Sequence, residues 1–261
     1  MKNFNFKSAS NAKEAAKLAS GRATFLAGGM SLLPAMKLRL AAYSDLINIK
    51  KIKTLSGIKV SSKSLRIGAT TTHASVASSK EVGKSIPSLA VLADGIGDPQ
   101  VRNRGTIGGS IANNDPAADY PSACLALNAT IHTSKRKIPA DKFFKGMFET
   151  DLKKGELIES VEFEIPEKSA YAKYPNPASR YAVVGVYVAK LKNEVRVAVT
   201  GAASSVFRSK ELEASLSNNF SASAIDSVNI SNKGLNSDIH ASAEYRAHII
   251  KVMAKKAVSS C

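Results

Sequence analysis

Two glycine pairs, each beside an apolar segment, constrain the fold of this chain more than any other feature of its sequence. The first lies in AGGMS, residues 27–31, and the second in TIGGS, residues 106–110. A glycine pair gives the backbone conformations closed to other residues and lets a ligand approach closely. Successive N–H groups in such a turn form a concave anion site, which a following helix strengthens. We therefore expect two turns that hold the two phosphates of one pyrophosphate.

Neither segment carries a common nucleotide-binding fingerprint. The GxGxxG pattern of Rossmann domains and the GxxxxGK[ST] pattern of P-loops are both absent, which argues against nicotinamide or ATP sites of those types. Each pair, taken alone, is also compatible with a tight turn that binds nothing.

Charged residues near the second pair are further candidates for ligand binding. Asp119 follows Gly109 by ten residues. A carboxylate there can accept hydrogen bonds from ribose hydroxyls, and the alternative is a helix-start or surface acid. Arg102 and Arg104 either face phosphate or are surface charges.

The sequence contains no convincing acid, base, nucleophile or set of metal ligands. The histidines lie far apart without metal-ligand spacing, and we expect all four to be structural: His73, His132, His240 and His248. Cys124 lies in the apolar run SACLAL and is expected to be a buried small hydrophobe. We therefore expect no catalytic residue and no metal site, with the chemistry carried by a bound cofactor.

The net charge of +16 is concentrated at the two ends of the chain. Residues 1–66 hold 13 Lys and Arg against two Asp and Glu, and residues 169–261 hold 12 against six. The lysines lack the interleaved aromatic residues of a stacking platform, so we expect no nucleic-acid binding. A basic surface that faces an acidic partner or an anionic ligand is the remaining interpretation.

Nothing in the sequence predicts a membrane segment or a secretory leader. No run of 18 apolar residues occurs, and the first twenty residues lack the apolar core of a signal peptide. The two cysteines give no disulfide framework. We expect a cytoplasmic protein.

Periodicity and capping signals predict a mixed α and β chain. Helices are expected at 11–20 with Asn11 as N-cap, and at 31–40, 71–79, 85–97, 208–228 and 240–260. Strands are expected at 3–10, 23–27, 45–49 and 157–165, with hairpins at 57–70 and 180–204 and a helix followed by a strand over 119–132. The polar segment 166–180 contains three prolines and is the plainest domain boundary. It separates an N-terminal domain, 1–165, with lobes of 1–50 and 51–165, from a C-terminal domain, 166–261.

Four motifs, in order and in spacing, closely resemble the FAD-binding medium subunits of molybdenum hydroxylases, most of all that of aerobic carbon monoxide dehydrogenase. They are FLAGGMSLLPAMKLRL, LRIGATTTHASVASS, IGDPQVRNRGTIGGSIANNDPAADYPSACLAL and NPASRYAVVGVYVA. The flavin domain of xanthine dehydrogenase is similar but more distant. The resemblance covers nearly the whole chain.

The resemblance implies an α+β fold and a set of FAD contacts. The fold is the two-part FAD-binding fold shared with vanillyl-alcohol oxidase and p-cresol methylhydroxylase, with a smaller C-terminal α+β domain. The implied contacts are Phe25, Leu26, Ala27, Gly28, Gly29, Met30, Ser31 and Leu32 in a first loop, Thr106, Ile107, Gly108, Gly109 and Ser110 in a second, and Asp119, Ile158 (Leu157 in the alternative register) and Lys173. Tyr181 stands where relatives often place an aromatic residue near the flavin. Met30 departs from the Gln, His or Thr common there, so a side-chain hydrogen bond to FAD is expected to be missing.

The implied function is electron transfer. Substrate is oxidised at a molybdopterin cofactor in a large subunit, and electrons pass through [2Fe–2S] clusters in a small subunit to FAD in this chain, then to quinone, NAD⁺ or another acceptor. The family builds dimers of heterotrimers. The sequence names neither the substrate nor the acceptor. Two alternatives stay open: a free-standing flavin oxidase of the same fold, and a basic binding module without flavin.

Overall fold

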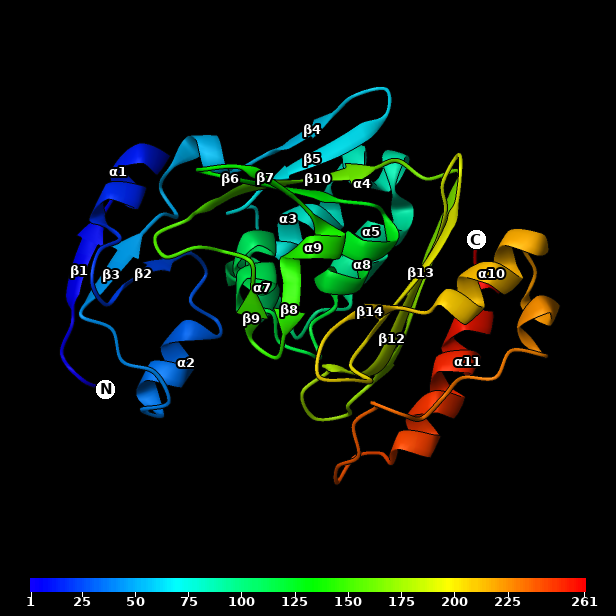
Figure 1. Cartoon of the computed structure of the whole chain (residues 1–261). Helices are drawn as coiled ribbons and strands as arrows, with labels where there is room; N and C mark the ends of the chain where they lie inside the picture. Colours follow the sequence, from blue (N-terminus) through cyan, green and yellow to red (C-terminus); the bar gives the residue numbers. More distant parts are fainter.

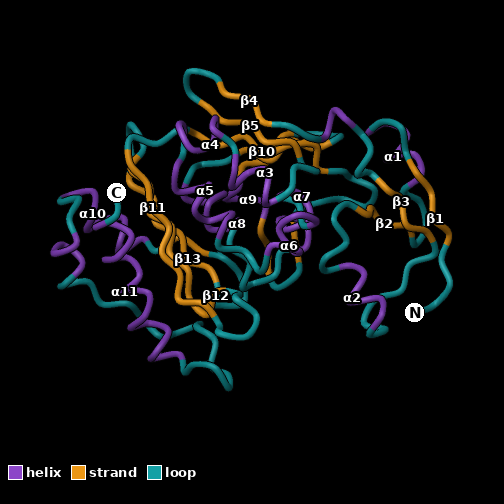
Figure 2. The backbone as a smooth tube through the Cα atoms, turned by 180° about the vertical axis from the view of Figure 1, so that it is seen from behind, coloured by secondary structure: helices purple, strands orange, loops and turns teal.

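The computed structural model describes residues 1–261 and contains three regions (Figure 1). Each region has its own hydrophobic cluster packed against a β-sheet. The three regions follow one another along the chain and lie side by side, with the N-terminal and C-terminal regions at opposite ends in both views (Figures 1 and 2). The α+β class predicted from the sequence is confirmed. No helix combines the length and the apolar character needed to cross a membrane.

The N-terminal region is a small parallel sheet of order β1-β3-β2 with two short helices. Its elements are β1 (Asn5–Ser8), α1 (Ala12–Leu18), β2 (Ala23–Leu26), α2 (Leu32–Lys37), β3 (Asp45–Asn48) and the 3₁₀ turn η1 (Lys53–Leu55). The side chain of Asn11 accepts a hydrogen bond from the Glu14 N–H and caps α1, as predicted.

The middle region is an antiparallel sheet of order β4-β5-β10-β6-β7 with helices packed beneath it. Its strands are β4 (Ile58–Val60), β5 (Ser64–Gly68), β6 (Thr130–Thr133), β7 (Lys137–Pro139) and β10 (Ile158–Glu164), with a separate hairpin of β8 (Phe144–Gly146) and β9 (Glu149–Thr150). Its helices are α3 (His73–Ser78), α4 (Lys80–Ser85), α5 (Pro87–Asp94), α6 (Pro99–Arg104), α7 (Ile107–Asn113), α8 (Tyr120–Ala126) and α9 (Ala140–Phe143).

The C-terminal region is a four-stranded antiparallel sheet with helices on one face. Its elements are β11 (Lys168–Pro175), β12 (Ala182–Lys190), β13 (Val195–Thr200), β14 (Phe207–Arg208), α10 (Lys210–Asn218), the 3₁₀ turn η2 (Ala222–Ile225) and α11 (Ala243–Ser259). Helix α11 packs on the outer face and helices α5 and α8 of the middle region pack on the inner face. Strand β12 is therefore buried on both faces, which explains its continuous apolar run AVVGVYVA.

The segment that marks the plainest domain boundary in the sequence, 166–180, is mostly strand. Strand β11 pairs with β12 over its full length, and its proline lies at its last residue. Proline is tolerated at the end of an edge strand, where no ladder hydrogen bond is lost. The domain boundary at 165/166 itself stays a prediction.

A buried arginine joins the C-terminal sheet to the middle region. Arg196 in β13 is 2% exposed. Its Nη2 donates to both carboxylate oxygens of Asp141 at 2.6 Å, and its Nη1 donates to Asn128 Oδ1 at 2.6 Å.

Replacing this arginine should loosen that junction. Arg196→Ala leaves a buried void, removes the donor to Asn128 and leaves Asp141 with only Arg208 Nη1, at 3.5 Å. We therefore expect the free energy of unfolding to fall by about 2 kcal/mol and the melting temperature by about 5 °C. The matched control is Lys190→Ala, which removes an exposed ion pair to Glu167 and should change the melting temperature by only about 1 °C. Equal melting temperatures for the two variants in differential scanning calorimetry would contradict this role.

Candidate cofactor site

The loop that follows β2 presents a run of unpaired backbone donors. The six consecutive N–H groups of residues 27–32 donate to no backbone acceptor, and the first such bond of α2 runs from the Leu33 N–H to the Gly29 carbonyl at 3.1 Å. Gly29 has φ of +76°, the left-handed conformation that turns successive N–H groups toward one side. Ser31 makes no capping hydrogen bond. This loop therefore has the donors that an anion needs.

The second glycine pair has a different geometry from the one the sequence predicts. Gly108 and Gly109 lie in the first turn of α7 rather than in a tight turn. The Ile107 N–H donates to the Thr71 carbonyl at 3.1 Å, and the Gly108 N–H to the Ala69 carbonyl at 2.9 Å. The hydroxyl of Thr106 accepts from the Gly109 N–H at 3.2 Å. These N–H groups are already used within the chain, so this segment is not a second free cradle.

The two glycines of α7 do different work. A Cβ on Gly108 would lie 2.5 Å from the Cβ of Ala69, so this glycine lets the helix pack on the loop after β5. A Cβ on Gly109 would meet only the Thr106 hydroxyl, at 2.9 Å, and Gly109 is exposed. Gly109 thus leaves open space at the start of the helix, where the helix dipole favours negative charge.

A close backbone approach brings the two segments together. A Cβ on Gly28 would lie 2.1 Å from the Arg104 carbonyl oxygen and 2.9 Å from the Cα of Gly105. Gly105 in turn lies on the ring of His73, since a Cβ there would be 2.6 Å from His73 Nε2. Burial lowers the pKa of His73 to about 4, so this ring is neutral at ordinary pH. The first loop therefore packs on residues 104 and 105, directly before α7, and these residues pack in turn on His73.

Asp119 is buried, which excludes the interpretation as a surface acid. It is 4% exposed, directly before α8. Its Oδ1 accepts from the Tyr171 hydroxyl at 2.5 Å and lies 3.0 Å from Lys173 Nζ. Lys173 Nζ also donates to the Gly95 carbonyl at 2.8 Å. Burial raises the pKa of Asp119, and the lysine and the tyrosine oppose that rise. Both partners bind Oδ1, which leaves Oδ2 for a further donor.

The segment before Asp119 is fixed by the C-terminal sheet. The Ala182 N–H donates to the Ala117 carbonyl at 3.3 Å, and the Gly201 N–H donates to the Pro116 carbonyl at 2.8 Å. The hydroxyl of Thr200 donates to the Ala118 carbonyl at 2.7 Å. Residues 115–119 therefore follow the ends of β12 and β13 rather than moving as a free loop.

The chain is similar to known FAD-binding proteins. Residues 2–168 match the family described as the FAD binding domain in molybdopterin dehydrogenase. The chain belongs to this family. FAD is the cofactor of its members, and the recognition made from the four motifs is confirmed.

Individual relatives agree with the family match. The glyceraldehyde dehydrogenase medium chain of Sulfolobus acidocaldarius is 36% identical, over 97% of this chain and 96% of the relative. The carbon monoxide dehydrogenase medium chain of Hydrogenophaga pseudoflava is 38% identical, over 71% of this chain and 69% of the relative. A solved structure of carbon monoxide dehydrogenase from Hydrogenophaga pseudoflava, lacking the Mo-pyranopterin moiety of its cofactor, superposes with a TM-score of 0.90 at 33% identity, over 99% of this chain and 96% of that one.

The residues present fit FAD. The unpaired N–H groups of the first loop suit a pyrophosphate, and the partner-free oxygen of Asp119 suits a hydroxyl or N–H donor of the cofactor. Arg104 is exposed at the end of α6, next to Gly28. The sequence named the first loop, the second loop, Asp119 and Lys173 as FAD contacts. The structure joins the two loops through Gly28 and joins Asp119 to Lys173, and the His73 ring lies 5.4 Å from that of Tyr120, the residue after Asp119. The roles of these residues toward FAD stay predictions.

The remaining candidates from the sequence, at positions 157/158, 181 and 30, make none of the contacts described above with both glycine segments. Leu157 belongs to the N-terminal hydrophobic cluster on which Phe25 and Ala27 pack, whereas Ile158, one residue later, belongs to the middle cluster. Leu157 is thus the residue of this pair that lies with the first loop. Tyr181 is 43% exposed and directly precedes the Ala182 bond to segment 115–119. The Met30 side chain is 38% exposed.

Sequence reasoning missed Tyr171 and the support given by His73. A signal for Tyr171 existed: on a strand it shares a face with Lys173, two residues later. His73 was assigned a structural role, and nothing local to it shows that its ring supports Gly105. No group of three or more His, Cys, Asp or Glu side chains has the geometry to hold a metal ion.

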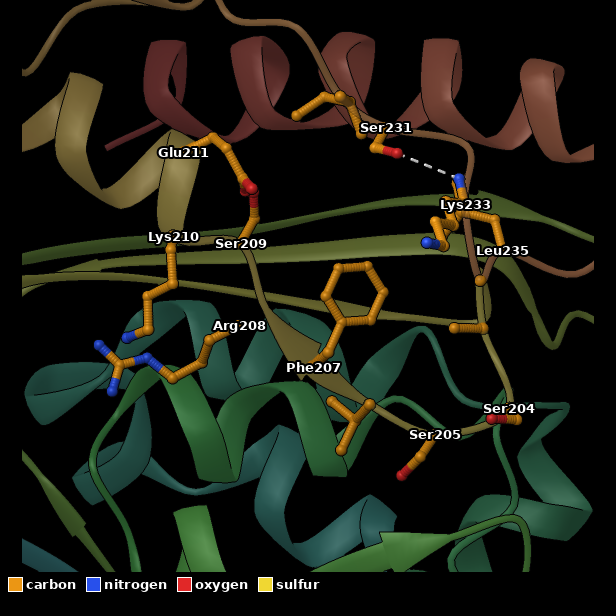
Figure 3. Close-up of a pocket in the computed structure, with 14 residues that line it drawn as sticks. Ser204, Ser205, Phe207, Arg208, Ser209, Lys210, Glu211, Ser231, Lys233 and Leu235 are labelled. Atoms are coloured by element: carbon orange, nitrogen blue, oxygen red, sulfur yellow. Dashed lines mark hydrogen bonds between the residues drawn. The ribbon is translucent and has the colours of Figure 1, made fainter.

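Two measurable cavities lie away from these residues. One of about 430 Å³ lies in the C-terminal region, where Phe207, Lys233 and Leu235 border it and Ser231 accepts from the Lys233 N–H (Figure 3). The other, of about 330 Å³, is lined by polar residues between η1 and β10. Neither includes a residue of the two glycine segments or Asp119.

The open space at Gly109 makes a sharp prediction. Gly109→Val should fill the start of α7 and abolish stable FAD binding while the chain stays folded, because its Cβ meets only one hydroxyl. The matched control is Gly83→Val in α4, where a Cβ meets nothing within 4 Å. Flavin retained after gel filtration measures the effect. A folded Gly109→Val protein with stoichiometric FAD would remove Gly109 from the site.

Proposed function

We propose that this chain is the electron-transfer flavoprotein subunit of a molybdenum hydroxylase complex, which receives electrons from [2Fe–2S] clusters of a partner subunit and passes them to an external acceptor. The observation that carries the proposal is the run of six unpaired N–H groups beside the start of α7. It supports dinucleotide binding in a chain whose sequence offers no acid–base pair of its own.

The residues of this chain bind and orient the cofactor rather than transform a substrate. The first loop neutralises the pyrophosphate through backbone donors. Asp119 and Lys173 add a buried charge pair, and the His73 ring supports the backbone at Gly105, next to the residue that Gly28 contacts. Bound FAD supplies the redox chemistry, since it exchanges electrons with both one-electron and two-electron partners.

The proposal requires partner chains. Two relatives are named medium chains, of glyceraldehyde dehydrogenase and of carbon monoxide dehydrogenase. By analogy with them, we propose a small subunit with [2Fe–2S] clusters and a large molybdopterin subunit, assembled as a dimer of heterotrimers. This chain has two cysteines, too few to ligate such a cluster by itself. The large subunit then selects the substrate.

Anaerobic spectroscopy tests the division of labour. The FAD-loaded chain alone should keep its oxidised visible spectrum when mixed with carbon monoxide, aldehydes, purines or nicotine-type heterocycles. After chemical reduction, the same chain should be reoxidised by a quinone or by NAD⁺. Flavin reduction by one of these substrates in the isolated chain would instead support the free-standing oxidase.

A second outcome distinguishes the basic binding module. That function predicts no FAD retained by the chain and nucleic-acid binding that falls steeply with salt concentration. Stoichiometric FAD together with no salt-dependent nucleic-acid binding would exclude it.

A further inference from the structure

Tyr171 connects the C-terminal sheet to the charge pair of the FAD site. It lies on β11 two residues before Lys173, and both side chains reach Asp119 Oδ1, at 2.5 Å and 3.0 Å. Strand β11 alternates, with Ala170 and Ala172 buried in the core of the C-terminal region. Tyr171 and Lys173 therefore project from the opposite face, toward the middle region.

A glycine on the neighbouring strand, diagonal to this tyrosine, makes room for its hydroxyl. Lys173 is the direct cross-strand partner of Gly185 in β12. A Cβ at Gly185 would lie 2.4 Å from the Tyr171 hydroxyl oxygen and 2.9 Å from the Thr200 methyl carbon. Glycine in the interior of a strand weakens it, and such a glycine marks a close approach of another group. Here the approaching group is the Tyr171 hydroxyl.

The tyrosine at the facing position has a different use. Tyr187 pairs with Tyr171 across β11 and β12, with ring centroids 5.9 Å apart. Its hydroxyl bonds to Ser88 at 2.6 Å and makes no contact with Asp119. The two tyrosines thus resemble each other in place and packing but differ in their partner.

We propose that Tyr171 is a positioning residue of the FAD site, which acts through Asp119 and requires glycine at position 185. The hydroxyl fixes Oδ1 together with Lys173, so that Oδ2 keeps one orientation toward the cofactor. The carboxylate that meets FAD from the middle region is then aimed by a strand of the C-terminal region. The inference rests on the assignment of Asp119 to the FAD site.

A double-mutant cycle on FAD affinity tests the inference in the full-length chain. Tyr171→Phe should weaken FAD binding about tenfold, because Asp119 loses a hydrogen bond of the charged kind. Asp119→Asn should weaken it at least as much. The double variant should bind no more weakly than Asp119→Asn alone, since Tyr171 acts only through the carboxylate. FAD titration followed by flavin fluorescence gives the three dissociation constants.

Tyr187→Phe is the matched control. It removes a hydroxyl of the same kind from the facing position, so a general loosening of the sheet should affect both variants alike. We expect FAD affinity within about twofold of the unmodified chain for this variant. A loss equal to that of Tyr171→Phe would reduce Tyr171 to a structural residue.

Gly185→Ala tests the same hydroxyl by crowding it with an added Cβ instead of removing it. The added Cβ should displace the hydroxyl from Asp119 and lower FAD affinity as Tyr171→Phe does. Combined with Tyr171→Phe, it should cause a smaller further loss of affinity, because the hydroxyl at 2.4 Å is gone and the Thr200 methyl carbon at 2.9 Å remains. If Gly185→Ala lowers FAD affinity equally with and without the hydroxyl, the requirement for glycine is wrong.

The outcomes distinguish failure of the positioning role of Tyr171 from failure of the assignment of Asp119 to the FAD site. Unchanged FAD affinity in Asp119→Asn would remove Asp119 from the site, and the inference with it. A loss in Asp119→Asn without a loss in Tyr171→Phe would overturn the positioning role alone. Additive losses in the double variant would show that Tyr171 acts independently of Asp119.

Discussion

The approach of Gly28 to the carbonyl oxygen of Arg104 is the contact on which the cofactor site depends. A side chain at position 28 is excluded, because even a Cβ would lie 2.1 Å from that oxygen. The contact holds the loop after β2 against the start of α7, although the loop belongs to the N-terminal region and the helix to the middle region. The next residue, Gly105, lies on the His73 ring. The separation of the two FAD segments is therefore set by packing between regions, not by the loops themselves.

The two glycine segments look alike in sequence and differ in what they offer a ligand. Residues 27–32 keep their N–H groups free, whereas the first N–H groups of α7 are taken by Ala69, Thr71 and Thr106. The first segment is thus the electrostatic cradle, and the second is a rigid wall whose opening at Gly109 leaves room for the ligand. This asymmetry concentrates the positive potential of the backbone on one side of the site.

Local signals predicted most elements, because caps, turns and alternation act within a few residues. The Asn11 cap, the hairpin of β4 and β5 and the strand β10 follow from such signals. They are weaker for β11, where a polar segment with prolines becomes a strand through pairing with β12. The sequence predicts the candidate site only in part. A motif locates Asp119, but the burial of this residue and its partners depend on strand β11, much later in the chain. The pairing of N–H groups in α7 likewise depends on carbonyls that precede α3.

The burial of Asp119 is best understood through the cofactor. Taking a carboxylate and an ammonium out of water costs more than a well-packed apolar pair would, so a buried ion pair such as Asp119 with Lys173 is weak evidence of stabilisation. The pair persists with a further donor, Tyr171, and with a strand glycine that gives this donor room. The family match ends at residue 168, before all three of these supports. We therefore expect cofactor binding to depend on the three regions together: the first supplies backbone donors, the second supplies Gly109 and Asp119, and the third orients Asp119 through Tyr171 and Lys173.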